Sequence, residues 1–324
     1  FGTSSDDPRV AALDEMTFAE WLDREGFDDP GVRWAVRYAS RDDYGTEPEQ
    51  LSAWFGLAYF AARAEAHATE SAPFIAWPDG NARIAAHLGQ AVGRGRLHTG
   101  QVAASVRPRG GEGRCRAVSL DAAGAARTWS ARSVVFALPS YVRPYLLPEP
   151  LHGTYRPDYA PWIVSNVHLS GRPEYRGFET AWDNVIVDSE SLGYVVATHQ
   201  GGSAFGPTVW THYIPFSGAD ARAERERAAS LTWDDATDAV FSDLARAHPD
   251  LGEHVQRIDV LRWGHGMVRP EPGVAFSRER ARACAAVDGV HFAHTDLSGA
   301  ALLEEAVHHG VRAADEILAE LRSM

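Results

Sequence analysis

The most informative absence in this chain of 324 residues is lysine, because all 31 of its basic residues are arginine. Without lysine the chain can form no Schiff base, offer no lysine general base and carry no phosphate-binding loop of the lysine type. The 44 acidic residues give a formal net charge of −13. A surface this negative repels phosphate backbones, so the charge argues against nucleic acid as a partner.

Cysteine and long apolar runs are also scarce. Cys115 and Cys284 lie far apart in the sequence, which argues against a disulfide framework and a cysteine-based metal site. No apolar run approaches the ~20 residues that a membrane-spanning helix needs. No signal-peptide pattern follows Phe1, and nothing in the sequence assigns a compartment. The composition is that of a globular protein, and the length indicates about two domains.

The first ninety residues are expected to be mainly helical. Thr17 to Glu20 form a capping box that opens a short helix. A second helix is predicted to start near Pro48, where apolar residues fall at helical spacing. These residues are Leu51, Trp54, Phe55, Ala58, Tyr59 and Ala62. A turn at Asp79 to Asn81 precedes a third helix through Leu88.

Short strands are expected from residue 97 onward. Four candidates between glycine-rich turns predict an antiparallel meander: Val102 to Val106, Cys115 to Leu120, Ala126 to Ser130 and Val134 to Leu138. A second group comprises Trp162 to Leu169, Val185 to Val187, Tyr194 to Thr198 and Val209 to Ile214. One long helix is predicted from about Asp220 to Ala247, and a strand around Ile258 to Trp263 follows it.

The clearest unit is a strand, a polar turn and a helix at the end of the chain. Gly289 to Ala293 is the strand, and Asp296 to Gly299 is the turn. A helix N-terminus offers unpaired N–H groups and partial positive charge, and Asp296 can accept hydrogen bonds from sugar-type hydroxyls. Gly299 would let a ligand approach the backbone. The residues alone also allow a plain helix cap by Asp296 or Ser298, and this alternative stays open.

This closing unit resembles the carboxy-terminal FAD-binding signature of the flavin amine oxidases, the superfamily that includes protoporphyrinogen oxidase and phytoene desaturase relatives. The matching residues are His291-Phe292-Ala293-His294-Thr295-Asp296, Gly299, Glu305-Ala306, Gly310 and Ala313-Ala314. The resemblance implies that Asp296 binds the ribityl chain of FAD. It also implies that the backbone at Leu297, Ser298 and Gly299 faces the flavin. His294 stands where the family usually has glycine.

Other stretches resemble the same family in the same order. Trp77 to Asn81 is similar to its proline-glycine-glycine segment, and Val102 stands where a valine lies against the adenine. Val134 to Pro139 resembles the strand that leads out of the FAD domain, which implies Ala137 and Pro139 as cofactor-binding residues. Trp263 to Met267 resembles the tryptophan segment over the flavin, which implies Trp263 and His265 as catalytic candidates.

More narrowly, the chain is similar to bacterial FAD/NAD(P)-binding amine oxidoreductases. The resemblance implies an α/β fold, with α+β character, made of a Rossmann-type FAD domain and a mixed-sheet substrate domain. Residues 75–140 and 280–324 would form a partial FAD-binding domain, and residues 1–74 and 141–279 the substrate domain. A glycine-rich turn between a strand and a helix, which a dinucleotide fold needs, is not found. We therefore expect that an N-terminal segment required for the full FAD site is missing and that this chain alone is inactive.

The function that the resemblance implies is FAD-dependent oxidation, in which the flavin accepts hydride from an amine or a similar small apolar substrate. An FAD-dependent desaturase or isomerase, and a non-catalytic binding protein that retains the fold, are the alternatives. A metal hydrolase is a further alternative, but His308 and His309 are adjacent and no histidine pair has i, i+4 spacing, so no metal is expected. Many members hold a lysine near the flavin; here Arg262, His265 and Arg269 are the candidate cations.

Overall fold

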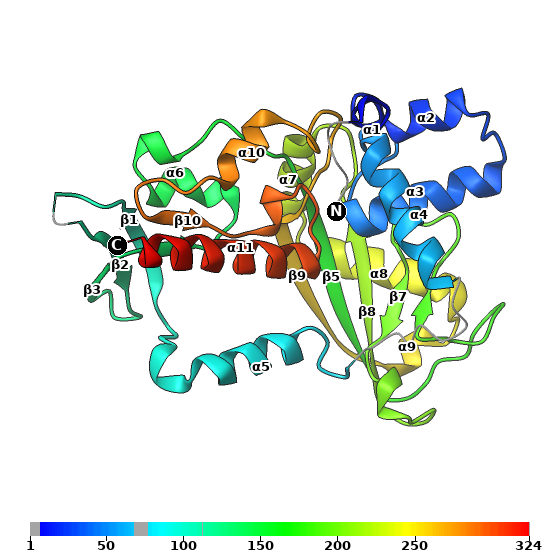
Figure 1. The fold of residues 1–324 in the computed structure, drawn as a ribbon. Coiled ribbons are helices and arrows are strands. Elements are labelled where there is room, and N and C mark those ends of the chain that lie inside the picture. The colour runs from blue at the N-terminus through cyan, green and yellow to red at the C-terminus, as the bar shows by residue number, and fades with distance from the viewer. Residues whose placement is uncertain (1–6, 68–76, 112, 324) are drawn as a thin grey trace.

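The computed structural model describes residues 7–67, 77–111 and 113–323, which form two lobes (Figure 1). The α-helices are α1 (Pro8–Asp14), α2 (Phe18–Arg24), α3 (Pro30–Tyr44), α4 (Ala53–His67), α5 (Ala82–Val92), α6 (Arg143–Leu146), α7 (Ala221–Ser230), α8 (Trp233–Ala247), α9 (Leu251–His254), α10 (Arg278–Cys284) and α11 (Leu303–Arg322). The strands are β1 (Val102–Arg107), β2 (Cys115–Leu120), β3 (Ala126–Ala131), β4 (Val134–Phe136), β5 (Tyr159–Leu169), β6 (Asp183–Asn184), β7 (Tyr194–Val196), β8 (Thr208–Pro215), β9 (Val255–Val268) and β10 (Val290–Phe292). Two short 3-10 helices also matter, η2 (Ser140–Val142) and η5 (Thr295–Leu297).

An antiparallel five-stranded sheet, in the order β6-β7-β8-β5-β9, is the centre of one lobe. Side chains alternate between its faces, as in any strand. Ile163, Val167 and Leu169 of β5 pack against α7 and α8 in two buried clusters, so these helices cover one face. Trp162 lies on the other face and contacts Tyr38 of α3. The two faces of the sheet therefore have different neighbours.

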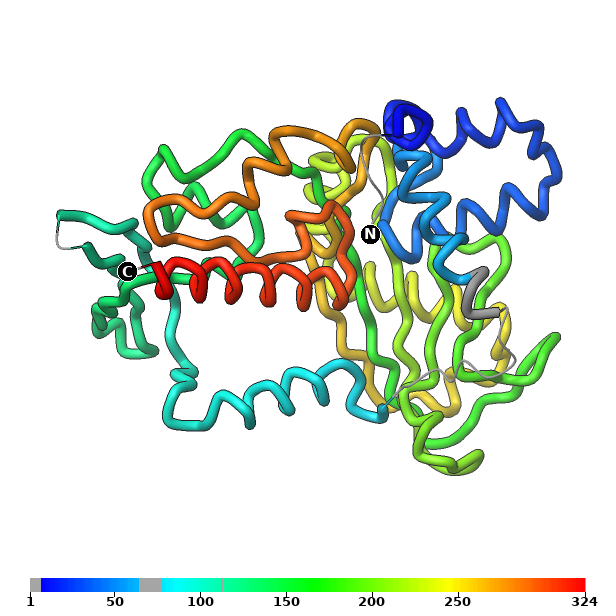
Figure 2. Tube along the Cα trace, in the orientation of Figure 1, coloured from blue at the N-terminus to red at the C-terminus, as the bar shows by residue number. Residues whose placement is uncertain are grey.

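The second lobe holds a parallel pair, β10 and β4, and a separate antiparallel sheet in the order β1-β2-β3. Phe136 of β4 and Phe292 of β10 meet edge to face at 6.0 Å, in a buried cluster that includes Leu297. Helix α11 runs alongside this pair, and α5 stands apart from it across an open space (Figures 1 and 2). The parallel pair thus carries the segment that enters η5 and then α11.

The N-terminal helices brace the segment that precedes the closing unit. Phe18 and Phe55 share a buried cluster with Ala275 and Ala300. The backbone N–H of Gly273 donates to the carbonyl of Asp14 at 2.6 Å. Residues from the two ends of the sequence therefore form one packed unit, which holds the approach to η5 in place.

The structure confirms several predicted elements and corrects two. The capping box at Thr17, the helix through Leu88 and the β1-β2-β3 meander are present. The strand from Val134 is not part of the meander: it pairs in parallel with β10. Parallel partners are joined by long connections, so the local spacing of strands and turns could not reveal this pairing. Residues 185–187 were wrongly expected to be a strand; in the structure they follow β6 and lie outside it.

The long helix predicted from Asp220 to Ala247 is two helices, α7 and α8. The break falls at Leu231 and Thr232. Thr232 is the N-cap of α8: its hydroxyl accepts from the Asp235 N–H at 3.1 Å, and the Asp235 carboxylate accepts from the Thr232 N–H at 2.9 Å. This second capping box satisfies N–H groups that would otherwise lack partners, so a new helix starts there.

Replacing Thr232 should therefore lower the stability of the protein. Thr232→Ala removes the cap acceptor, and we expect the free energy of unfolding to fall by about 1 kcal/mol. Thr232→Ser keeps the hydroxyl and is the matched control, with most of the stability retained. Urea unfolding followed by circular dichroism measures both variants. Equal losses in the two variants would show that the cap hydroxyl is not responsible.

Candidate functional site

The turn after β10 is organised by the buried carboxylate of Asp296, which is 2% exposed. Its Oδ2 accepts the backbone N–H of Ser140 at 2.7 Å and the hydroxyl of Tyr159 at 2.5 Å. Its Oδ1 lies 3.1 Å from Nδ1 of His294. One side chain therefore joins three segments: the exit of β4, the start of β5 and the end of β10.

The surroundings of Asp296 keep it ionised. Burial by itself raises the pKa of a carboxyl group. Here the hydrogen bond and charge of His294, with the bonds from Tyr159 and Ser140, outweigh burial and lower the pKa of Asp296 below its usual value. For Tyr159, burial and the adjacent charge of Asp296 raise the pKa. At neutral pH Tyr159 is therefore a neutral donor and Asp296 a charged acceptor.

Ser298 ties the same turn to α11. Its hydroxyl donates to the Glu305 carboxylate. Burial and the charge of Arg312 lower the pKa of His309 to about 4, so His309 is neutral. Nε2 of His309 lies 2.9 Å from the Ser298 oxygen, and its Nδ1 accepts from Nε of Arg312 at 3.3 Å. This pattern assigns the histidine proton to Nε2 and leaves no free hydroxyl on Ser298.

The open hydrogen-bonding groups of the turn are at the start of α11. The N–H groups of residues 297–299 are bonded to the carbonyl groups of residues 294–296. The N-cap residue of α11 is Leu302, which has no side-chain acceptor. Within the described part of the chain, no acceptor meets the N–H groups of Leu303 and Glu304. An uncapped helix N-terminus attracts an acceptor atom or an anion.

A β-bulge presents His265 to this turn. Ala160 of β5 pairs with Met267 and Trp162 pairs with Trp263, so a single residue of β5 lies opposite three residues of β9. Bulges re-aim side chains and are frequent beside active sites. His265 sits in the middle of this bulge. Its ring stacks on Tyr141 at 4.0 Å and meets the edge of Tyr159 at 5.2 Å. The bulge therefore brings a histidine of the sheet to residues that surround Asp296.

The environment of His265 favours its neutral form. Partial burial lowers the pKa of this imidazole, and the positive charge of Arg225 on α7 adds to the effect. The charge of Asp296 acts in the opposite direction but is outweighed. His265 is thus a neutral group at pH 7 that can accept a proton.

The face of the sheet beyond the bulge combines aromatic and acidic groups. Trp162 and Trp263 lie opposite each other on this face, and Val164 pairs with Tyr213 in the next row. Tyr38 of α3 packs on the same aromatic cluster. One turn later on α3, Asp42 makes no hydrogen bond or ion pair with any described residue. Burial raises the pKa of Asp42 to about 6, and the nearby charges of Asp43 and Asp183 contribute.

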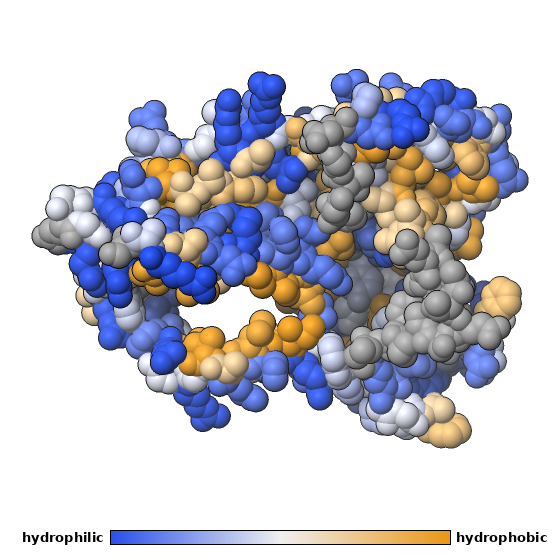
Figure 3. Space-filling view, in the orientation of Figure 1, coloured by the Kyte–Doolittle hydropathy of each residue, from blue (hydrophilic) through white to orange (hydrophobic). Residues whose placement is uncertain are grey.

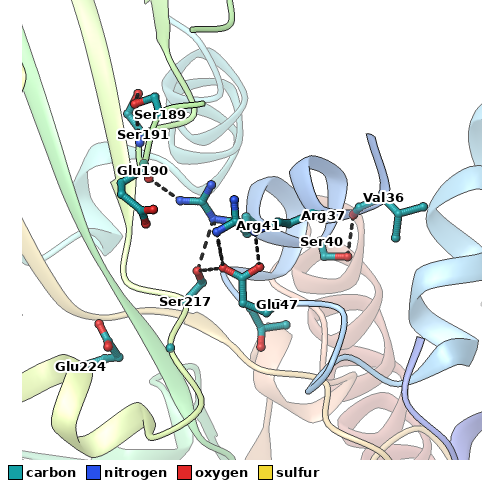
Figure 4. Close-up of polar contacts among 12 residues, drawn as sticks. Val36, Arg37, Ser40, Arg41, Glu47, Ser189, Glu190, Ser191, Ser217 and Glu224 are labelled. Carbon is teal, nitrogen blue, oxygen red and sulfur yellow. Dashed lines mark hydrogen bonds and ion pairs between the residues drawn. The ribbon is translucent and has the colours of Figure 1, made fainter. Parts of the chain in front are cut away.

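Helix α3 is fixed over the sheet by a buried arginine (Figure 4). Nε of Arg41 donates to the hydroxyl of Ser217 at 3.3 Å, and its guanidinium also donates to the carbonyl of Glu190. Glu47 accepts from Ser217 at 2.6 Å and forms two hydrogen bonds with Arg37. This network joins α3 to segments beside β7 and β8. It holds Tyr38 and Asp42, which share the helix with Arg41, above the sheet.

The sequence-predicted cofactor residues fall into two groups. Ala137 and Pro139 lie in the segment between β4 and Ser140, and the backbone N–H of Ser140 meets Asp296. Leu297 is fully buried in the lobe core, and Gly299 has a φ of +77°, where an added Cβ would lie 2.8 Å from Val274. Val102 is different: it is the first residue of β1 and is 68% exposed, in the separate three-stranded sheet.

Of the candidate cations, the structure brings His265 to the turn. Arg262 donates to the carbonyl groups of Ala229 and Leu231 at the end of α7. Arg269 is buried and bonds to Gly218 and Thr46. Both guanidinium groups therefore have structural partners elsewhere.

Sequence reasoning missed the partners that hold Asp296. No role was predicted for Tyr159. Ser140 contributes a backbone N–H, which no side-chain pattern can reveal. Tyr141 and Asp42 were likewise assigned no role, because their place in the site depends on how distant segments pack.

Two searches of the described residues gave nothing. None of the helices found there is long and apolar enough to cross a bilayer. No group of three or more His, Cys, Asp or Glu side chains among those residues is placed to hold a metal ion.

A hollow lies between α5 and α11, and apolar side chains line its rims in the space-filling view (Figure 3). The exposed large apolar residues of the two helices are Leu88 and Val92 on α5, and Val307, Val311, Leu318 and Leu321 on α11. A flat aromatic ring system suits an apolar hollow, and the open N–H groups at the start of α11 suit the acceptor atoms on the polar edge of such a ring. The described residues are therefore compatible with a flavin.

Comparisons with known proteins agree on one family. The family model described as flavin-containing amine oxidoreductase matches residues 3–318. The chain matches none of the curated proteins. Among solved structures, cyclohexylamine oxidase from Brevibacterium oxydans IH-35A has a TM-score of 0.68 and 17% identity, over 98% of this chain and 70% of that one. Putrescine oxidase bound to putrescine has a TM-score of 0.68 and 15% identity, over 97% and 70%. At these identities the structural likeness shows the fold.

The bulge gives a matched pair of glycine variants. A Cβ on Gly266 would lie 2.7 Å from Cδ1 of Trp162 and 3.2 Å from the Ala160 carbonyl oxygen, whereas a Cβ on Gly264 meets nothing within 4 Å. We expect Gly266→Ala to lower the free energy of unfolding by about 1–3 kcal/mol, because Trp162 must move. Gly264→Ala should change it by about 0.5 kcal/mol or less. Urea unfolding followed by tryptophan fluorescence measures both, and equal effects would contradict the close packing at Gly266.

Proposed function

The chain belongs to the family of flavin-containing amine oxidoreductases, and from this premise we propose that it oxidises a small amine with FAD as its cofactor. When bound, the flavin supplies the redox chemistry by accepting hydride from the carbon next to the amine nitrogen. The protein's own residues bind and orient the amine and exclude water from the site. The observation that carries the proposal is the junction where Asp296 joins the turn, the exit of β4 and the substrate-facing sheet.

The proposed cofactor lobe comprises residues 75–140 and 280–324, and the proposed substrate lobe comprises residues 1–74 and 141–279. In the cofactor lobe, the open N–H groups at the start of α11 suit an acceptor on the pyrimidine edge of the flavin. Asp296 remains the proposed residue for the ribityl chain. Because its carboxylate already accepts several hydrogen bonds, we propose that it also acts by shaping the turn. Val102, Ala137 and Pro139 stay predictions.

On the substrate side, two features support an amine. The aromatic face of Trp162 and Trp263 offers apolar contact and ring faces that attract cations. The Asp42 carboxylate, which forms no hydrogen bond or ion pair with a described residue, would attract an ammonium group as it approaches. A net charge of −13 acts in the same direction. We propose that the amine enters along this face and that its reacting carbon is placed near the bulge.

His265 is the proposed acid–base group beside the reacting centre, with Trp263 as a neighbouring wall. The sequence has no lysine to act there. His265 is neutral at pH 7 and lies against Tyr141 and Tyr159. It can therefore accept a proton without a change in the buried network. Oxidation of a carbon–carbon single bond to a double bond would make the protein a desaturase. Release of ammonia together with an aldehyde or ketone identifies amine oxidation instead.

The cofactor part of the proposal predicts that Asp296→Ala weakens FAD binding. Loss of the carboxylate leaves the Ser140 N–H and the Tyr159 hydroxyl buried without an acceptor, so the turn should lose its shape. We expect the dissociation constant for FAD to rise about tenfold or more. Flavin absorbance after gel filtration measures the occupancy. Asp315→Ala, at an exposed position of α11, is the control; unchanged occupancy in the Asp296 variant would refute its role.

The substrate part predicts an effect on KM. Asp42→Asn keeps the shape but removes the charge, and we expect KM for a primary amine to rise about tenfold with little change in kcat. In the unmodified protein KM should rise as the pH falls below about 6, where Asp42 becomes protonated. In Asp42→Asn this rise of KM at low pH should be absent, because the variant has no carboxylate at position 42.

Initial rates between pH 5 and pH 8 test this expectation. Glu49→Gln, at an exposed carboxylate of the N-terminal segment, should behave like the unmodified protein. If KM is the same in the Asp42 variant and the unmodified protein across this range, Asp42 does not receive the ammonium group.

A further inference from the structure

Tyr159 is the one described side chain that contacts both Asp296 and the bulge histidine. It is the first residue of β5 and is 4% exposed. Its hydroxyl donates to Asp296 at 2.5 Å. The edge of its ring meets His265 at 5.2 Å and Tyr141 at 5.3 Å. A single buried phenol thus contacts the sheet, the exit of β4 and the turn before α11.

His265 depends on these rings for its position. Gly264 and Gly266, which flank it, offer no side chains that could hold it. No hydrogen bond from a described residue fixes the imidazole; it is stacked on Tyr141 at an interplanar angle of 19° and meets Tyr159 at 73°. Aromatic contacts of this kind contribute about 0.5–1.5 kcal/mol each. The orientation of His265 therefore follows the orientation of the Tyr159 ring.

The orientation of Tyr159 is in turn set at its hydroxyl. The hydrogen bond to an ionised, buried carboxylate is a strong one, about 1.5–3 kcal/mol. Asp296 is held independently by the Ser140 N–H and by His294. The contacts thus run from the turn through Asp296 and Tyr159 to His265. The first is a hydrogen bond and the second is a contact between rings.

We propose that Tyr159 is a positioning residue, whose hydroxyl couples the proposed acid–base residue His265 to the turn that would hold the flavin. The inference rests on the proposed function, because it assigns a reaction step to His265. Tyr159 itself donates its proton to Asp296 and transfers none. Its effect is to keep the imidazole at a fixed place relative to the start of α11, and misplacement by about 1 Å is enough to slow a reaction up to a hundredfold.

The chain offers a matched control in Tyr155. It is also a buried tyrosine, and the charge of Asp296 contributes to the raised pKa of its hydroxyl after burial. Unlike Tyr159, its hydroxyl has no hydrogen-bond partner among the described residues. Tyr155→Phe therefore removes a hydroxyl from the same region without breaking the link, whereas Tyr159→Phe removes the link and keeps the ring.

The test compares Tyr159→Phe and Tyr155→Phe in the complete protein. The first readout is independent of turnover: the imidazole carbon signals of the histidines are followed by NMR as the pH changes, and His265→Gln assigns the signal of His265. The groups facing His265 are Arg225 from α7, Tyr141 from η2, Tyr159 from β5 and Asp296 from η5. Without the phenol, less of the Asp296 charge is compensated, so the pKa of His265 should rise in the Tyr159 variant and stay unchanged in the Tyr155 variant.

The second readout is the split between kcat and KM with an amine substrate. We expect Tyr159→Phe to lower kcat about tenfold, with KM and FAD content close to those of the unmodified protein. Tyr155→Phe should change neither constant. Equal histidine titrations in both variants, or a loss limited to thermal stability, would overturn the proposal. If no amine reduces the flavin of the unmodified protein, the proposed function fails, while the histidine titration still decides whether Tyr159 couples Asp296 to His265.

Discussion

The arrangement of the site depends on one buried charge, the carboxylate of Asp296. A buried ion is stable only where donors replace the water that it has lost. Here the backbone N–H of Ser140 and the hydroxyl of Tyr159 donate to the carboxylate, and the imidazole of His294 lies 3.1 Å from its other oxygen. These residues lie at the exit of β4, the start of β5 and the end of β10. The carboxylate can be satisfied only when the exit of β4, the start of β5 and the end of β10 meet at one point. The need to satisfy this charge thus fixes how the two lobes approach each other.

A second constraint is the close approach of backbone to Trp162. Gly45, at the end of α3, has a φ of +60°, and an added Cβ would lie 2.9 Å from Nε1 of this indole. Gly266 of the bulge approaches Cδ1 of the same ring to 2.7 Å by the same measure. Two glycines from distant segments therefore let α3 and β9 close around one aromatic ring. This ring separates the bulge from the region of Tyr38 and Asp42.

Patterns among neighbouring residues predicted the elements that depend on neighbouring residues alone. The capping box at Thr17, the helix after Asn81, and the strand and helix of the closing unit follow from turn residues and periodicity, and the structure contains them. The partner of β4 could not be predicted, because pairing with β10 depends on a contact between residues 134 and 290. Asp296 was found from its place between a strand and a helix. Its burial was not predicted, because Ser140 and Tyr159, which donate to it, lie more than a hundred positions earlier in the chain.

The protonation states of the neighbouring groups explain why we propose His265 for proton transfer at this junction. Every basic side chain other than histidine is a guanidinium, which stays charged at any physiological pH and cannot act as a base. Asp296 has a lowered pKa and already accepts hydrogen bonds from Ser140 and Tyr159. Tyr159 has a raised pKa and is a poor acid. The imidazole of His294 is engaged with Asp296.

His265 is neutral, is carried on a bulge and has no hydrogen bond to a described residue. A general base works best when its pKa lies near the working pH and its lone pair is available. Among the described groups around Asp296, His265 is a neutral imidazole that no described residue engages in a hydrogen bond, which is why we propose it as the base. The absence of lysine thus makes the bulge histidine the residue on which proton transfer would depend.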